Sequence, residues 1–156
     1  MGGGALRKTI GIIGAGSCPP EVEGLAKGVG REVARRGYVL ICGGLGGVMR
    51  AACEGAKEMG GFTVGILPTA HKEDANPFVD LAIPTGMGHA RNVIIVHSSD
   101  ALIAIAGEAG TLSEIAIAMK VGKPVVGLRS WSLEGRIPQA SRPEEAVQMA
   151  LQLMRR

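Results

Sequence analysis

The chain has 156 residues, 46% of them hydrophobic, which suits one globular domain over residues 1–156 with a core of its own. Only 3% of the residues are aromatic and the 17 Lys and Arg are scattered, so the net charge of +3 predicts no nucleic-acid partner. The three cysteines form no CxxC pair and no zinc pattern with the three histidines, and no apolar run is long enough for a membrane span. We therefore expect a cytoplasmic protein with reduced thiols, no metal site and no membrane partner.

Short apolar runs alternate with longer helical patterns along the chain. Strands are predicted over 8–13, 38–42, 62–67, 78–83, 101–105 and 124–128. Helices are predicted over 20–36, 48–59, 90–98, 111–121 and 143–154. The remaining segments 71–77, 84–88 and 129–141 have neither periodicity and are predicted as turns or irregular structure.

This alternation, with strands that are apolar throughout, predicts an α/β fold. We expect a Rossmann-like, doubly wound, mainly parallel sheet with helices on both faces. Ligands of such sheets bind in the crevice beyond the carboxyl ends of the strands. The loops that begin at Gly14, Gly43, Pro84 and Ala106 are therefore the ones to examine for a site.

The loop from Gly14 begins like the dinucleotide-binding fingerprint but lacks its third glycine. Glu21 and Glu23 also place negative charge where a pyrophosphate would lie, so ordinary NAD binding is disfavoured. Gly14 fits a tight strand-to-helix turn, and Gly16 and Ser17 are candidates for lining a pocket.

The segment Gly43–Met49 combines four glycines with the start of a predicted helix. Exposed backbone N–H groups and the helix dipole together favour an anion cradle. Close packing of the helix on its strand explains the glycines equally well, and no Gly-Lys-Ser/Thr follows as in a P-loop. The candidate ligand-binding residues here are Gly43, Gly44, Gly46, Gly47 and Met49.

The segment Gly107–Glu114 also follows a strand and opens a helix. Thr111 and Glu114 match a capping box, which accounts for both residues without a ligand. The loop nevertheless offers backbone donors, a hydroxyl and a carboxylate at the carboxyl edge of the sheet. Gly107, Gly110, Thr111 and Glu114 are therefore candidates for ligand binding.

Arg91 lies at or near a predicted helix start, where a cation opposes the helix dipole. An anionic ligand nearby would compensate for this. An exposed arginine or an arginine paired with a carboxylate are the alternatives.

Two motifs carry a family resemblance. Residues 42–49 resemble the GGGxxGLM loop, and residues 106–114 the PGGxGTxxE loop, of the Lonely-guy-like nucleotide-binding superfamily, and the resemblance covers roughly residues 8–128. The runs 111–116 and 65–68 are typical of the short branch that contains the molybdenum-cofactor carrier proteins.

The resemblance implies a binding protein for a phosphorylated nucleotide or nucleotide-like cofactor, with molybdenum cofactor as a candidate. The alternative that it implies is a phosphoribohydrolase that releases ribose 5-phosphate from AMP-type nucleotides. Arg91 and Glu114 would then be catalytic, and Gly110 and Thr111 would hold the 5′-phosphate. A lysine decarboxylase is not supported, because no lysine at a strand end could hold pyridoxal phosphate.

The resemblance also implies a homodimer or homotetramer. The apolar helix predicted within 112–121, with Ile115, Ala116, Ala118 and Met119, would supply the contact, or it packs on the sheet instead.

The chain departs from the family pattern at the site itself. Ala106 replaces the proline of PGGxGTxxE, Glu108 its second glycine, and Asn92 the lysine that follows the family arginine. A carboxylate inside a phosphate cradle repels a dianion unless it points outward. These changes weaken the hydrolase interpretation and are compatible with a carrier whose ligand is a pterin phosphate. A module that kept the fold and lost the ligand is the third possibility.

Overall fold

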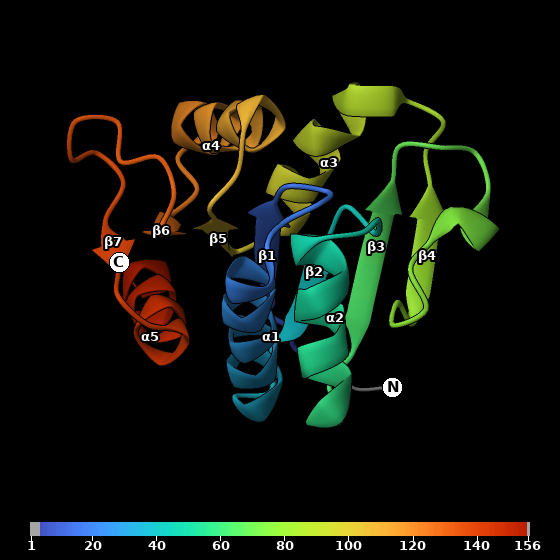
Figure 1. The fold of residues 1–156 in the computed structure, drawn as a ribbon, viewed down its shortest axis with the longest axis horizontal. Helices are drawn as coiled ribbons and strands as arrows, with labels where there is room; N and C mark the ends of the chain where they lie inside the picture. The colour runs from blue at the N-terminus through green and yellow to red at the C-terminus, as the bar shows by residue number, and fades with distance from the viewer. Residues whose placement is uncertain (1–3, 156) are drawn as a thin grey trace.

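A single sheet of seven parallel strands organises the computed structural model, which describes residues 4–155 (Figure 1). Its strand order is β4-β3-β2-β1-β5-β6-β7. The strands are β1 (Thr9–Gly14), β2 (Val39–Cys42), β3 (Thr63–Leu67), β4 (Leu81–Pro84), β5 (Ala101–Ile105), β6 (Val125–Leu128) and β7 (Gln139–Ala140). Every paired register is parallel, so the predicted mainly parallel sheet is parallel throughout the described residues.

Helices cover both faces of this sheet. One face carries α1 (Pro20–Arg35), α2 (Val48–Glu58) and α5 (Pro143–Met154), and the other carries α3 (Arg91–Ser98) and α4 (Ala109–Val121). Two single 3-10 turns, Lys72–Asp74 and Gly88–Ala90, lie in the connections. The predicted doubly wound α/β Rossmann-like fold is confirmed. None of the helices within residues 4–155 is both long and apolar enough to cross a membrane.

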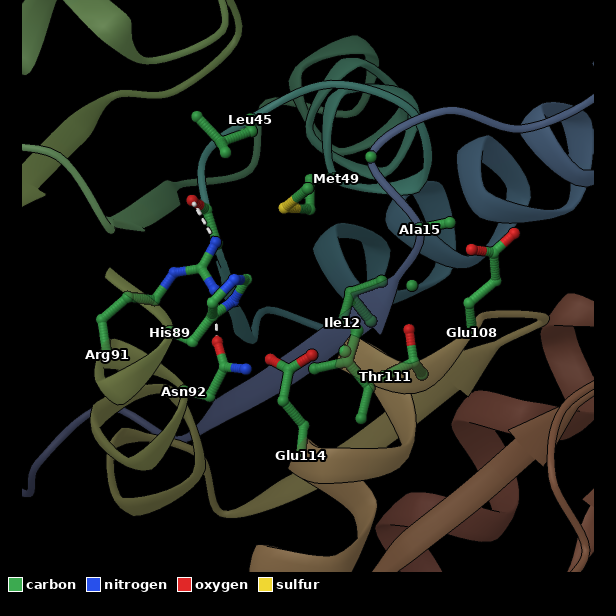
Figure 2. A pocket seen from close by; sticks show the side chains of 15 residues that line it. Ile12, Ala15, Leu45, Met49, His89, Arg91, Asn92, Glu108, Thr111 and Glu114 are labelled. Carbon is green, nitrogen blue, oxygen red and sulfur yellow. Dashed lines mark hydrogen bonds between the residues drawn. The ribbon is translucent and has the colours of Figure 1, made fainter. Parts of the chain in front are cut away.

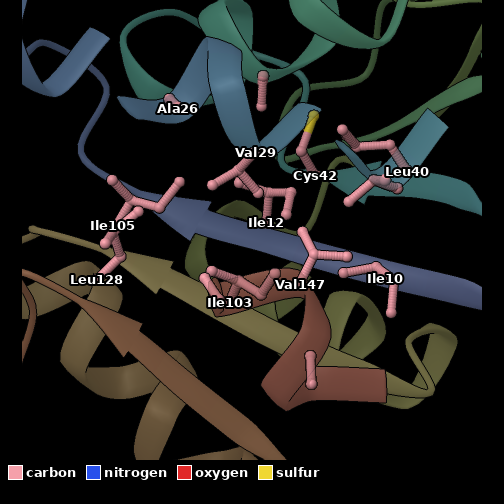
Figure 3. Packing of buried hydrophobic residues seen from close by; sticks show 14 of the residues in the cluster. Ile10, Ile12, Ala26, Val29, Leu40, Cys42, Ile103, Ile105, Leu128 and Val147 are labelled. Carbon is pink, nitrogen blue, oxygen red and sulfur yellow. The ribbon is translucent and has the colours of Figure 1, made fainter. Parts of the chain in front are cut away.

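The core explains why the strands read as continuous apolar runs. Successive strand residues point to opposite faces, so Ile12 packs under α1, α2 and α5 while Ile13 packs under α3 and α4. Figure 3 shows the first of these clusters, in which Ile10, Ile12 and Leu40 lie against Val29 of α1 and Val147 of α5. Both faces are covered by helices, which is why the strands are apolar on both sides.

Most predicted elements agree with the structure to within one residue at each end, and the exceptions have local causes. The strand predicted over 78–83 begins only at Leu81. The segment before it is a turn, because the Asn76 side chain accepts a hydrogen bond from the Phe78 N–H and donates one to the Leu45 carbonyl. Thr63 Oγ1 donates to the Phe78 carbonyl, which removes Phe78 from the strand ladder.

Two further predictions need correction. The helix predicted from Thr111 begins at Ala109, its N-cap is Glu108, and no side chain caps it, so the capping box of Thr111 and Glu114 does not form. The segment predicted as irregular over 129–141 contains the short edge strand β7. Its two residues pair with β6, a length too short for periodicity to reveal.

The strand order places a crevice at the middle of the sheet. The chain runs outward from β1 through β2 and β3 to β4, then returns to β5 on the other side of β1. The connections after β1 and β5 therefore diverge above neighbouring strand ends, which is where ligands bind in sheets of this type.

Candidate functional site

A cavity of about 260 Å³ lies at this carboxyl edge of the sheet (Figure 2). Of the residues predicted from the sequence, eight line it: Gly14, Gly16, Gly43, Met49, Arg91, Gly110, Thr111 and Glu114. Five others lie in the same loops but not in the lining: Ser17, Gly44, Gly46, Gly47 and Gly107. The two glycine-rich loops therefore face one cavity.

Seven further residues complete the lining. They are Ile12, Ile13, Ala15, Leu45, His89, Asn92 and Glu108. Asn92 and Glu108 are two of the positions where the chain departs from the family pattern. His89 has one signal that could have found it, its place two residues before Arg91. The four apolar residues, Ile12, Ile13, Ala15 and Leu45, have no sequence signal that distinguishes them from ordinary core or loop residues.

Arg91 forms one wall of the cavity and is buried, with 8% of its surface exposed. Its Nε donates to the Ile66 carbonyl at 2.9 Å, its Nη2 to the Gly43 carbonyl at 3.4 Å, and its Nη1 to Asn92 Oδ1. Within residues 4–155 it pairs with no carboxylate. Both alternatives from the sequence, an exposed arginine and a carboxylate pair, are therefore wrong.

Burial lowers the pKa of Arg91, and the nearby Glu114 carboxyl opposes that shift. An arginine keeps its charge under such a shift because its ordinary pKa lies so high. The cavity therefore holds a desolvated cation whose hydrogen-bond partners are all neutral. A guanidinium has five N–H groups, and three of them are used by these partners, so two remain for a ligand.

The loop after β2 has glycines because neighbouring groups come too close for side chains. A Cβ at Gly43 would lie 2.5 Å from Arg91 Nη2 and 2.8 Å from Met49 Sδ. Gly47 has φ +60°, and a Cβ there would lie 2.4 Å from the Ala15 carbonyl oxygen. Close packing therefore explains the glycines of this loop. Because Gly43 has no side chain, the Arg91 guanidinium fits beside it at the cavity wall.

Two thiols lie directly beneath the same loop. Cys42 Sγ is 3.5 Å from Cys53 Sγ and accepts the Gly44 N–H at 3.3 Å. The contact with Cys53 lowers the pKa of the Cys42 thiol, and either thiol can donate the hydrogen bond. Cys18, Cys42 and Cys53 are all free thiols, as predicted.

The loop after β5 leads into a helix whose first backbone N–H groups are open. The N–H groups of Ala109, Gly110 and Thr111 open α4 without an acceptor in the described part of the chain. Figure 2 shows the exposed Glu108 side chain beside Ala15, across the cavity from Arg91. These backbone donors and the helix dipole form a positive end that faces the hollow.

The residue before this loop, Ala106, has φ +48°. Proline cannot adopt such an angle, because its ring fixes φ near −65°. Ser130 Oγ donates to the Ala106 carbonyl at 2.6 Å and holds the turn. The replacement of the motif's proline by Ala106 therefore goes together with a different backbone at this strand end.

Glu114 lies on the first turns of α4 and points into the cavity that Arg91 also faces (Figure 2). It is buried, with 6% exposed, and its carboxyl has no hydrogen-bond partner among residues 4–155. Burial raises the pKa of Glu114 to about 8, although Arg91 works against the rise. At neutral pH the Glu114 carboxyl is therefore mostly the neutral acid, which can donate a hydrogen bond.

The charged and neutral groups lie at different parts of the cavity. It has a cationic wall at Arg91, a positive helix end at α4, a neutral acid between them, and a carboxylate at the rim. Such an arrangement can hold a compact anionic group and, beside it, a group that accepts from the Glu114 carboxyl. It fits a phosphate carried on a polar body.

Comparison with known proteins identifies the family. The model of the SLOG cluster4 family matches residues 7–154. The chain belongs to this family. The cytokinin riboside 5′-monophosphate phosphoribohydrolase of Mycobacterium tuberculosis is 36% identical over 130 residues, which cover 71% of this chain and 69% of that protein. The resemblance to the Lonely-guy-like superfamily is confirmed.

Solved structures of the same superfamily superpose closely. The molybdenum cofactor binding protein of Rippkaea orientalis has a TM-score of 0.91 and 37% identity, covering 97% of this chain and 99% of that one. The molybdenum cofactor carrier protein of Chlamydomonas reinhardtii has a TM-score of 0.85 and 32% identity, covering 97% and 100%. This family member is thus similar both to a hydrolase and to cofactor-binding proteins.

Proposed function

We propose that the protein binds a phosphorylated nucleotide or nucleotide-like cofactor in the cavity between the two loops, with molybdenum cofactor as the candidate ligand. The observation that carries the proposal is the buried Arg91, which has two N–H groups without a partner among residues 4–155 and lines the same cavity as the first turn of α4. A desolvated cation without a carboxylate partner is costly, and an anionic ligand offsets that cost.

The ligand is placed with its phosphate at the first turn of α4. Gly110 and Thr111 supply the backbone donors there, and the Thr111 side chain lines the cavity. The Arg91 guanidinium then lies against a second polar part of the ligand. Glu108 at the rim favours a ligand with little negative charge on that side. The similarity to the cofactor-binding proteins of Rippkaea and Chlamydomonas supports this choice.

Two measurements test the proposal. Native mass spectrometry of the purified protein is expected to release a pterin phosphate or a nucleotide. AMP at about 100 times its Kd is expected to stabilise the protein by about 2.7 kcal/mol, whereas adenosine at the same concentration does much less. No released ligand, together with no thermal shift for any phosphate compound, would contradict the proposal.

A phosphoribohydrolase is the second candidate, and the shared cavity of Arg91 and Glu114 favours it, as does the similarity to the Mycobacterium tuberculosis enzyme. In that reaction Glu114 would have to be ionised to stabilise positive charge on the ribose or to orient water. A carboxyl with a pKa raised to about 8 is mostly protonated at neutral pH. Only about a tenth of Glu114 is then ionised at pH 7, so we expect little ribose 5-phosphate from AMP at that pH. Its appearance in quantity, and its loss in Glu114→Gln, would reverse the ranking.

Self-association as a homodimer or homotetramer remains part of the proposal. Ile115 and Ala118 of α4 pack on the sheet, so only part of the predicted contact surface is available. Met119 of α4 is 36% exposed, and Val93 of the neighbouring helix α3 is 41% exposed. We expect light scattering to give the mass of two or four chains, and Val93→Glu to lower it. A monomer at high concentration would contradict this.

A further inference from the structure

A chain of side-chain hydrogen bonds joins the two walls of the cavity. Asn92, 3% exposed on the first turn of α3, accepts the Arg91 Nη1 bond on Oδ1 and donates from Nδ2 to Ser113 Oγ at 3.2 Å. Ser113 Oγ donates in turn to the Gly110 carbonyl at 2.6 Å. The chain therefore begins at the guanidinium and ends at the peptide that opens α4.

The direction of each bond is fixed by chemistry. A guanidinium only donates, so the Asn92 oxygen must face Arg91 and its NH₂ must face Ser113. The Ser113 oxygen accepts from Asn92, so its own proton goes to the Gly110 carbonyl. Among common side chains, an amide at position 92 both accepts and donates at this spacing, whereas a lysine there could not accept from Arg91 at all.

We propose that Asn92 and Ser113 are positioning residues that hold the Arg91 guanidinium in register with the first turn of α4, so that one anionic ligand is bound by both walls. This inference rests on the proposed function for its ligand. The hydrogen-bond chain itself belongs to the ligand-free protein, so it is tested separately from ligand binding.

Ser113 is the residue to change, because it is exposed and lies outside the cavity lining. Ser113→Ala removes the hydroxyl, and Ser113→Thr retains it. Ser98→Ala is the matched control, an exposed serine at the end of α3 with no side-chain hydrogen bond in the described chain. Ser98→Ala and Ser113→Thr are expected to keep the thermal stability of the parent, whereas Ser113→Ala is expected to unfold at a slightly lower temperature because the buried Asn92 amide loses its acceptor.

The first readout is nuclear magnetic resonance of the arginine side chains without ligand. Three acceptors hold the Arg91 guanidinium, so its N–H signals are expected to exchange slowly with water. Ser113→Ala is expected to speed that exchange, while the backbone amides of α3 and the Ser98→Ala protein stay unchanged. Equal Arg91 exchange in the parent and in Ser113→Ala would overturn the proposal whether or not the protein binds AMP.

The second readout is the affinity for AMP by calorimetry. Ser113→Ala is expected to weaken binding about fivefold, which corresponds to the loss of one ordinary hydrogen bond. Ser113→Thr restores it, and Asn92→Ala with Ser113→Ala is no weaker than Asn92→Ala alone, because both act through one chain. Additive losses would overturn the proposal. Failure of the parent itself to bind AMP would instead count against the proposed function, and the Arg91 exchange would still decide this inference.

Discussion

The two glycine-rich loops look alike in sequence and differ in what their glycines do. In the loop after β2, a Cβ at Gly43 or Gly47 would lie within 2.5 Å of a neighbouring atom. After β5, Gly107 is also closely packed, with φ +104° and a Cβ position 2.5 Å from Thr111, whereas a Cβ at Gly110, on the first turn of α4, would meet nothing within 4 Å. The first loop is glycine-rich because the chain packs tightly around it, and the second leaves room at a helix end that opens into the cavity.

We therefore expect substitutions in the loop after β2 to affect stability, and substitutions at the start of α4 to affect binding. The packed loop holds the Arg91 wall, and changing it disturbs the fold. The open loop presents backbone donors, and changing it alters what fits into the cavity.

A large loss of stability is expected in Gly47→Ala. The residue has φ +60° and its Cβ would approach the Ala15 carbonyl oxygen, a backbone atom that cannot move aside alone. We expect the free energy of unfolding to fall by at least about 2 kcal/mol. Urea denaturation measures it. A variant as stable as the parent would show that the loop is looser than its contacts indicate.

The next effect is the pH dependence of stability caused by Glu114. Its folded-state pKa of about 8 lies above the ordinary 4.5, so the folded protein keeps a proton that the unfolded chain releases. The free energy of unfolding contributed by this group therefore falls as pH rises from about 4.5 to 8. Glu114→Gln removes this loss.

Denaturation at pH 5 and pH 8 tests this prediction. The advantage of Glu114→Gln over the parent is expected to grow with pH by up to about 1.4 kcal/mol per unit. Glu73→Gln, an exposed change on the 3-10 turn before β4, is the control and is expected to show no such trend. An advantage for Glu114→Gln that is the same at both pH values would contradict a buried acid.

A third effect distinguishes the open loop directly. Gly110→Ala is expected to leave stability unchanged or to raise it by up to about 1 kcal/mol, since alanine favours helix. Gly110 lines the cavity at the proposed phosphate position, so the added methyl group is expected to raise the Kd for AMP about tenfold. Gly24→Ala in α1, also with nothing within 4 Å, is the matched control for the helix effect. Unchanged AMP affinity in Gly110→Ala would place the phosphate elsewhere.

The smallest effect is expected from Glu108→Gln. The side chain is exposed at the rim, where solvent screens its charge. Removing the charge is expected to tighten AMP binding only about two- to threefold, and added salt is expected to reduce the difference. Calorimetry at two salt concentrations measures both. Weaker AMP binding by the variant would mean that Glu108 contacts the ligand.

The fold could be predicted because its signals are local. Apolar runs such as 101–105 and the helices between them determine a parallel sheet with two covered faces. The contrast between the loops could not be predicted, because Gly43 and Arg91 are 48 residues apart and only the fold shows that one makes room for the other. Thr111 and Glu114 show the same limit, since their spacing matches a capping box and burial places them at the cavity instead.

The most direct test is a titration of the protein with AMP, followed by backbone amide signals in nuclear magnetic resonance spectra. Binding between the two loops predicts that the amides of Ala109, Gly110 and Thr111 shift together with the side-chain N–H signals of Arg91, all with one Kd. Shifts confined to the hollow at the amino-terminal strand edge, lined by Arg7 and Lys57 among others, or no shifts at all, would contradict it.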